Sequence, residues 1–463
     1  MKGKVLFLFP NSEGYAGVPP GLAVLSAYLK KAGFDTKCFD TTFLKSPPKT
    51  QIQREKHGGV KKADYKELWG KWTPNMPKKI PTLLKKTIKE YKPDLIGVTL
   101  LDVFYKYAIE LLSHIKTDIP VVAGGITATT SPEFVIKNDC IDIVCRGEGE
   151  NPIVELATCI VENKDYTHIK NLWIKKEGEI IKNPLRPLRD ITTEEFQDWS
   201  LFDDKHYYKA YCGGFPRTGY FEMSRGCQFN CTYCATHSLR RIYKNLGKFM
   251  RFRNVDNALD EIVYAKDRYK LEMIFFMDDN FLGMSKDRFY YFAEQYKKRI
   301  NLPFHIQTRG ETIKEEYVKK LKEIGVSTIS IGIEHGNEEY RKKYLNRKIT
   351  NKDLIKVFDI IHKYGIRTTA NVIIGMPYET EEMIMDTIKL IREIKPKSYT
   401  LNFLMPFRGT KMREWAVELG YLPENHIITS SNEPLDMPEF RKDRIIHYYE
   451  NFGKYLKGEM CEL

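Results

Sequence analysis

Three cysteines stand close together in the chain with the spacing of metal ligands. Cys227, Cys231 and Cys234 fall in the run RGCQFNCTYCA, which reads Cys-x3-Cys-x2-Cys. A cubane iron–sulfur cluster normally takes four cysteines, so three would leave one iron open to bind a reacting molecule. The alternative is a structural zinc site, which takes four ligands and would need His237 as the fourth.

The cysteine run follows the first of a series of strand and helix patterns. Six βα units over residues 218–410 predict a partial barrel, which is smaller than a closed barrel of eight units. Polar residues at the carboxyl ends of these strands would meet at one mouth. The expected strands are Gly219–Met223, Met273–Met277, Phe304–Gln307, Thr328–Ile333, Thr368–Ile374 and Tyr399–Leu404.

A second alternation of strands and helices occupies residues 1–160 and predicts a doubly wound, Rossmann-like parallel sheet. Ligands of such a sheet bind at the carboxyl ends of its strands, where the strand order reverses. The expected strands are Val5–Phe9, Thr36–Phe39, Asp94–Leu100, Pro120–Ala123 and Asp142–Cys145, and the expected helices are Gly21–Lys31, Ile80–Tyr91 and Phe104–Lys116.

The remaining segments connect or extend these two units. Residues 161–217 are expected to form a linker with a hairpin over Ile169–Ile181, and residues 411–463 a small helical C-terminal region. Residues 44–79 hold Trp69 and Trp72 in a long insertion. The insertion is expected either to fold over a ligand or to lie on the surface with the tryptophans as anchors.

Composition limits the class of protein. The chain has 463 residues and is 42% hydrophobic, enough for two or three domains. No apolar run is long enough for a membrane span, and the apolar stretch before Pro10 is too short for a signal peptide. Nine cysteines without an even framework indicate a reducing compartment, so a cytoplasmic location is expected. The net charge of +13 indicates a lysine-rich solvated surface or an acidic partner, and no nucleic-acid-binding motif is present.

The cysteine motif, with Tyr233 before its last cysteine, resembles the signature of the radical S-adenosylmethionine (SAM) superfamily. The resemblance implies a 4Fe–4S cluster on the three cysteines, with SAM chelated by the open iron. One electron, from a donor such as flavodoxin or ferredoxin, would cleave SAM to a 5′-deoxyadenosyl radical. His335 and Arg408 depart from the residues usual in relatives, so their roles stay open. The positions that the resemblance assigns to SAM binding are Tyr233, Asp278, Asp279, Gln307, Arg309, Glu334 and Gly375.

The first unit resembles the cobalamin-binding domain of one branch of that superfamily. Three segments carry the likeness: Thr99 to Leu101, the pair Gly124-Gly125, and the run RGEGE that contains Glu148. The loop after the first strand lacks the histidine that ligates cobalt in mutases, because Ser12, Gly14 and Gly17 occupy the three motif positions. The implied cobalamin contacts are Ser12, Tyr15, Gly17, Thr99, Leu101, Gly124, Gly125 and Glu148, with ordinary packing as the alternative for Tyr15.

Together these likenesses imply a cobalamin-dependent radical SAM C-methyltransferase of the class B type. The radical would abstract hydrogen from an unactivated carbon, which would then take a methyl group from methylcobalamin. One alternative is a cyclase or rearrangement enzyme without methyl transfer. A methylthiotransferase would need three further N-terminal cysteines in a layout that Cys38, Cys140 and Cys145 do not have. A non-enzymatic cobalamin or metal sensor is a further alternative. The substrate class stays open among small molecules, lipids, tetrapyrroles and peptides.

Overall fold

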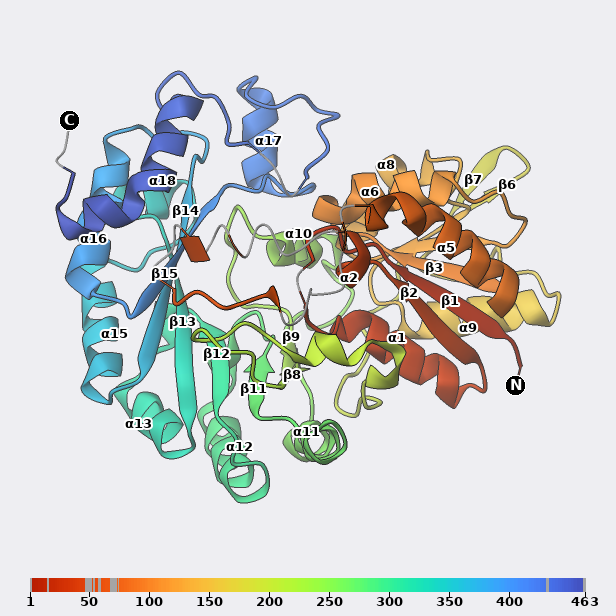
Figure 1. Cartoon of the computed structure of the whole chain (residues 1–463), viewed down its shortest axis with the longest axis horizontal. Helices are drawn as coiled ribbons and strands as arrows, with labels where there is room; N and C mark the ends of the chain where they lie inside the picture. Colours follow the sequence, from red (N-terminus) through yellow and green to blue (C-terminus); the bar gives the residue numbers. More distant parts are fainter. Residues whose placement is uncertain are drawn as a thin grey trace.

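The two predicted units lie side by side in the computed structural model (Figure 1). The structure describes residues 2–14, 16–45, 52, 55–56, 60–66, 73, 75–429 and 433–460. No helix in these ranges combines the length and the apolar composition that a membrane span requires.

The first unit is a seven-stranded sheet with the order β2-β1-β3-β4-β5-β6-β7. Its first five strands pair in parallel in the flavodoxin-like order, so the order in which strands are added to the sheet reverses between β1 and β3. The hairpin predicted in the linker is confirmed, and its strands extend this sheet in antiparallel pairing. The strands are β1 (Lys4–Phe9), β2 (Asp35–Asp40), β3 (Leu95–Thr99), β4 (Val121–Gly124), β5 (Ile143–Cys145), β6 (Leu172–Lys176) and β7 (Glu179–Lys182).

Helices cover both faces of this sheet because its central strands are apolar on both sides. In β1, Phe7 belongs to the core formed with α1 and α9, whereas Leu6 and Leu8 belong to the core with α5, α6 and α8. The doubly wound prediction is therefore confirmed. The helices of this unit are α1 (Pro20–Lys31), α2 (Thr42–Lys45), α5 (Met76–Tyr91), α6 (Asp102–Ser113), α7 (Ile126–Thr130), α8 (Pro132–Ile136) and α9 (Glu150–Val161).

The second unit is the predicted partial barrel, a six-stranded parallel sheet with the order β15-β14-β13-β12-β11-β8. A short antiparallel pair, β9 with β10, lies outside this sheet and follows its first strand. The strands are β8 (Thr218–Phe221), β9 (Ser224–Arg225), β10 (Arg251–Phe252), β11 (Met273–Phe276), β12 (Phe304–Thr308), β13 (Val326–Glu334), β14 (Arg367–Ile374) and β15 (Ser398–Phe403).

Several helices of the barrel start where the sequence offers a side chain that caps them. Asn254, Ser285 and Thr350 each accept a hydrogen bond from a backbone N–H in the first turn of α11, α12 and α15. The helices of this unit and of the C-terminal region are α10 (Ala235–Ile242), α11 (Val255–Tyr269), α12 (Lys286–Arg299), α13 (Glu315–Glu323), α14 (Glu338–Lys343), α15 (Asn351–Lys363), α16 (Met383–Ile394), α17 (Lys411–Glu418) and α18 (Lys442–Lys457). Short 3-10 turns lie at η1 (Trp199–Leu201), η2 (Asp204–Tyr207), η3 (Phe281–Gly283) and η4 (Gly310–Thr312).

The two units share one apolar core. A single cluster of buried side chains runs from α1 and α9 through Trp199 of the linker into the barrel. Trp199 stacks on Phe221 of β8, with ring centroids 5.4 Å apart. The linker is thus a packed part of the fold, and it fixes the first sheet against the barrel.

Part of the 44–79 insertion also packs on the linker. The buried side chain of Glu55 accepts hydrogen bonds from Ala63 N, at 3.1 Å, and from the Tyr65 hydroxyl, at 2.5 Å. Tyr65 contacts Phe215 edge to face, with centroids 5.3 Å apart. Trp69 and Trp72 lie outside the described residues, so the two expectations for this segment stay predictions.

Candidate active site

The three cysteines lie on the loop between β8 and α10, which we call the cluster loop (residues 222–234). Cys231 is buried, Cys227 and Cys234 are half-buried, and Cys234 is the residue that precedes α10. Gly226 has φ +88°, and a Cβ there would lie 2.6 Å from the Phe249 carbonyl oxygen, so only glycine fits beside the first cysteine.

The cysteines suit a cluster better than a single metal ion. Burial raises the pKa of Cys227 to about 11, so it is a protonated thiol until a metal displaces the proton. The zinc alternative needed His237 and the three sulfurs around one ion, at about 2.3 Å from each sulfur. Three thiols on one loop fit a cluster in which each sulfur binds a different iron.

The two aspartates after β11 have different positions. Asp278 is buried beneath the cluster loop, where it accepts hydrogen bonds from Ser224 Oγ at 2.5 Å and Met223 N at 3.2 Å. Burial raises the pKa of Asp278 to about 7. Asp279 accepts a hydrogen bond from Thr236 Oγ1 at 3.1 Å and lines an open cavity. Of the two predicted SAM contacts, Asp279 faces the cavity and Asp278 supports the loop.

Glu334, at the end of β13, has the left-handed backbone conformation, with φ +65°. Its carboxylate lies 3.2 Å from Arg347, whose Nη1 also donates to the Tyr233 hydroxyl at 3.0 Å. Burial raises the pKa of Glu334, and the arginine opposes that shift. The structure thus brings the predicted residues Glu334 and Tyr233 together through Arg347. Sequence reasoning missed Arg347 because it follows a helix, away from the strand end.

Arg309 differs from its expected role as a free partner for the SAM carboxylate. Its guanidinium pairs with Glu311, donates to Cys231 Sγ at 2.9 Å and stacks on the Phe229 ring, 3.8 Å from its centre. It is therefore already neutralised, and it packs against the cluster loop. Gln307 lies half-buried on β12 of the same sheet.

Gly375, the last predicted SAM contact, begins the turn after β14. It has φ +80°, and its N–H donates to Glu379 Oε2 at 2.7 Å, while the N–H of Met376 donates to the same oxygen at 2.9 Å. Glu379 is fully buried and lies 3.3 Å from His335 Nε2. His335, whose role the sequence left open, therefore supports this turn from below.

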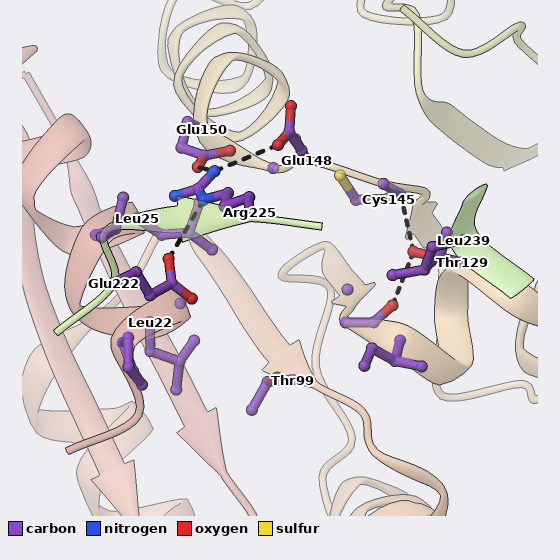
Figure 2. A pocket seen from close by; sticks show the side chains of 18 of the residues that line it. Leu22, Leu25, Thr99, Thr129, Cys145, Glu148, Glu150, Glu222, Arg225 and Leu239 are labelled. Atoms are coloured by element: carbon purple, nitrogen blue, oxygen red, sulfur yellow. Dashed lines mark hydrogen bonds and ion pairs between the residues drawn. The ribbon is translucent and has the colours of Figure 1, made fainter. Parts of the chain in front are cut away.

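A cavity of about 420 Å³ lies between the first sheet and the cluster loop. Its walls come from both units, at the carboxyl ends of β3 and β4 on one side and at β9 and α10 on the other. Figure 2 shows Thr99, Thr129 and Cys145 of the first unit around the same space as Arg225 and Leu239 of the second. The predicted site residues in its wall are Thr99, Gly124, Gly125, Glu148 and Asp279.

The pair Gly124-Gly125, which the sequence analysis singled out as a cobalamin contact, forms part of this wall. A Cβ on Gly124 would meet no atom within 4 Å, so its backbone faces open space. Gly125 has φ +99°, and a Cβ there would lie 2.7 Å from the Leu100 carbonyl oxygen. The backbone at Gly124 is therefore exposed to the cavity, and its contact with cobalamin stays a prediction.

Other predicted cobalamin contacts do not reach the cavity. Of the described residues, Ser12, Gly17 and Leu101 are absent from its wall. Gly17 lies at the linker instead, where its N–H donates to His206 Nδ1 at 3.2 Å. Tyr15 lies outside the described residues, so its expected position at the lower face of cobalamin stays a prediction.

Glu148 joins the two units at the edge of the cavity. Its oxygens accept from both terminal nitrogens of Arg251, at 2.8 and 3.0 Å, and Arg225 Nη1 lies 3.4 Å away. Arg225 also pairs with Glu150 at 2.6 Å, and Figure 2 shows the carboxylates of Glu148, Glu150 and Glu222 converging on it. Neither arginine was predicted, because only the fold brings them to these carboxylates.

Comparisons with known proteins agree with this geometry. The model of the radical SAM superfamily matches residues 221–391, and that of the B12 binding domain matches residues 74–157. An uncharacterised methyltransferase of Pyrococcus horikoshii is 29% identical over 72% of this chain and 72% of its own length. The anaerobic magnesium-protoporphyrin IX monomethyl ester cyclase of Rubrivivax gelatinosus is 24% identical over 85% of this chain and 66% of its own length.

A solved structure shares the arrangement of the two units. The radical SAM methyltransferase TsrM of Kitasatospora setae, with cobalamin and a 4Fe–4S cluster bound, superposes with a TM-score of 0.68 at 20% identity, over 91% of this chain and 79% of that one. Both family models match in the order in which the two units occur. The chain is a B12-binding radical SAM enzyme.

Proposed function

We propose that the enzyme is a C-methyltransferase that acts on an unactivated carbon. The observation that carries the proposal is the shared cavity of about 420 Å³, because the wall expected to hold cobalamin and the loop expected to hold the cluster face each other across it. Two reactive groups held on facing walls of one cavity react at a far higher effective concentration than two free molecules.

The residues of the chain have separate tasks in this proposal. The three cysteines would hold the 4Fe–4S cluster, Asp279 would offer a carboxylate to SAM, and the backbone at Gly124 would contact the corrinoid. When bound, the cluster with SAM supplies a 5′-deoxyadenosyl radical, and the corrinoid supplies a methyl group. The apolar shared core behind β8 keeps the two walls at a fixed separation.

A second candidate is a cyclase or rearrangement enzyme that transfers no methyl group. Its support is the likeness to the Rubrivivax cyclase, at 24% identity over 85% of this chain. The likeness to the Pyrococcus methyltransferase, at 29% identity, supports the first candidate. Both candidates need the same radical and differ only in the fate of the methyl group of SAM.

Deuteromethyl-labelled SAM separates these two candidates. The anaerobically reconstituted enzyme, with cobalamin and a reductant, is incubated with metabolite and peptide extracts of cells that lack its gene. We expect a product with the mass of an added deuteromethyl group on carbon, formed together with 5′-deoxyadenosine. A new product without label, formed with 5′-deoxyadenosine, would favour the second candidate. A variant with Cys227, Cys231 and Cys234 all changed to alanine should form neither compound.

A further inference from the structure

A strongly basic segment runs beside the cluster loop. Residues 340–348 read YRKKYLNRK and hold five basic side chains. The two arginines are buried: Arg341 donates to the His335 carbonyl at 2.6 Å, and Arg347 pairs with Glu334 at 3.2 Å. Lys342, Lys343 and Lys348 are exposed, and we call these three residues the lysine edge. The arginines serve the interior, whereas the lysines present their charges to solvent.

Two hydrogen bonds fix this segment against the residues on either side of a cluster cysteine. Asn346 Nδ2 donates to the Asn230 carbonyl at 3.0 Å, and Thr232 Oγ1 donates to the Tyr344 carbonyl at 2.6 Å. Asn230 and Thr232 are the chain neighbours of Cys231. The backbone that carries the lysine edge is therefore in direct contact with the loop that would hold the cluster.

The exposed side of the cluster loop carries further positive charge. Gln228 and Asn230 are exposed, and Arg240 spans them by donating to the Gln228 carbonyl at 3.0 Å and to Asn230 Oδ1 at 2.9 Å. Of the nearby acidic residues, Glu414 is already shared between Arg241 and Lys411, at 3.4 and 3.1 Å. Within the described chain, no member of the lysine edge forms an ion pair.

A half-buried group of aromatic side chains lies next to the lysine edge. Tyr344 stacks on Tyr378, with centroids 4.6 Å apart, and Trp415 meets Tyr344 edge-on at 6.0 Å. Lys343 lies over the Tyr344 ring at 4.7 Å, and Lys411 over the Trp415 ring at 5.6 Å. Half-exposed aromatic rings inside a charged border are typical of protein-binding surfaces.

We propose that this surface, formed by the lysine edge, Arg240 and the aromatic group, docks an acidic protein that donates single electrons. Exposed lysines are expected in a chain of net charge +13, but these lysines lie on the segment that is hydrogen-bonded to the cluster loop. In the step, the cluster gains one electron and the donor loses one, and no covalent bond forms or breaks. The proposal rests on the cluster and is independent of whether a methyl group is transferred. Charge complementarity speeds such encounters, and electron-transfer complexes need only small interfaces.

The test compares two electron donors on the reconstituted enzyme. One variant carries Lys342→Glu, Lys343→Glu and Lys348→Glu. Its matched control carries Lys297→Glu, Lys298→Glu and Lys319→Glu, three exposed lysines on α12 and α13. Cluster reduction is followed by loss of visible absorbance under anaerobic conditions. The donors are flavodoxin hydroquinone, as an acidic protein, and photoreduced deazariboflavin, as a small uncharged donor.

We expect the lysine-edge variant to be reduced by flavodoxin roughly tenfold or more slowly at low salt, with the difference shrinking as salt rises. Reduction by deazariboflavin should be unchanged, the control variant should match the wild type, and oxidised flavodoxin should bind the variant more weakly in calorimetry.

Equal flavodoxin rates and affinities in variant and wild type would overturn the proposal. Equal slowing with both donors would also overturn it, because the substitutions would then act on the cluster itself.

Discussion

Asp278 and Asp279 are neighbours in the chain, but the fold gives them opposite surroundings. Asp278 points into the protein and holds Ser224 and the Met223 amide at the start of the cluster loop. Asp279 lines the cavity. The sequence could place both aspartates at the same end of the barrel, because both follow the same strand. Which of them faces a ligand depends on the position of Ser224, and periodicity does not set that position.

The raised pKa of Asp278, about 7, predicts a pH-dependent contribution to stability. Between the usual aspartate pKa of about 3.9 and this value, the folded chain keeps a proton that the unfolded chain releases. The free energy of unfolding that Asp278 contributes should therefore fall as the pH rises from 5 to 8. The Asp278→Asn variant cannot titrate there, so the stability of the wild type relative to this variant should decrease over that range. Chemical denaturation of the cofactor-free protein at both pH values measures this, and a constant difference would contradict it.

At the scale of elements, the short pair β9–β10 decides how the cluster loop meets the first sheet. Arg225 on β9 and Arg251 on β10 both reach carboxylates at the start of α9, and Arg251 binds Glu148 through two nitrogens. The pair has only two residues on each strand, too few for a periodic pattern. The sequence therefore predicted the six barrel strands and missed this one contact between the units.

Glu148→Gln should weaken that contact. The substitution keeps the shape of the side chain but removes the charge that two partly buried arginines share, so we expect a loss of roughly 1–3 kcal/mol in the free energy of unfolding. Glu155→Gln is the matched control, because Glu155 also binds an arginine through two oxygens but is 46% exposed. The control should lose less than about 1 kcal/mol. Equal losses in urea titrations of the two variants would show that Glu148 does not connect the units.

At the scale of the whole molecule, the proposed function depends on the cavity between the first sheet and the cluster loop. Their separation is set by the shared core, in which linker residues such as Trp199 pack on both units. Neither unit alone offers the whole cavity wall. The spacing between the two cofactor sites is thus a property of the interface between the units.

Gly124 gives a way to fill the cavity without disturbing the fold. A Cβ there meets no atom within 4 Å, so Gly124→Phe should project into the cavity and weaken cobalamin binding about tenfold or more by steric overlap. Gly124→Ala should have a smaller effect. Cobalamin binding is measured by absorbance titration, and iron and sulfide content should stay at the wild-type level in both variants. Wild-type cobalamin affinity in the phenylalanine variant would place the corrinoid elsewhere.

The sequence by itself determined the cluster cysteines, the glycine pair and the two series of strands and helices. These features are local, because ligand spacing and hydrophobic periodicity follow from backbone geometry over a few residues. Only the tertiary structure decided which side chains meet across long separations. Glu148 binds Arg251 across 103 positions, and Asn346 of the segment that carries the lysine edge contacts Asn230 across 116. Such pairs form only when packing brings distant loops together, and no local pattern in the chain predicts these contacts.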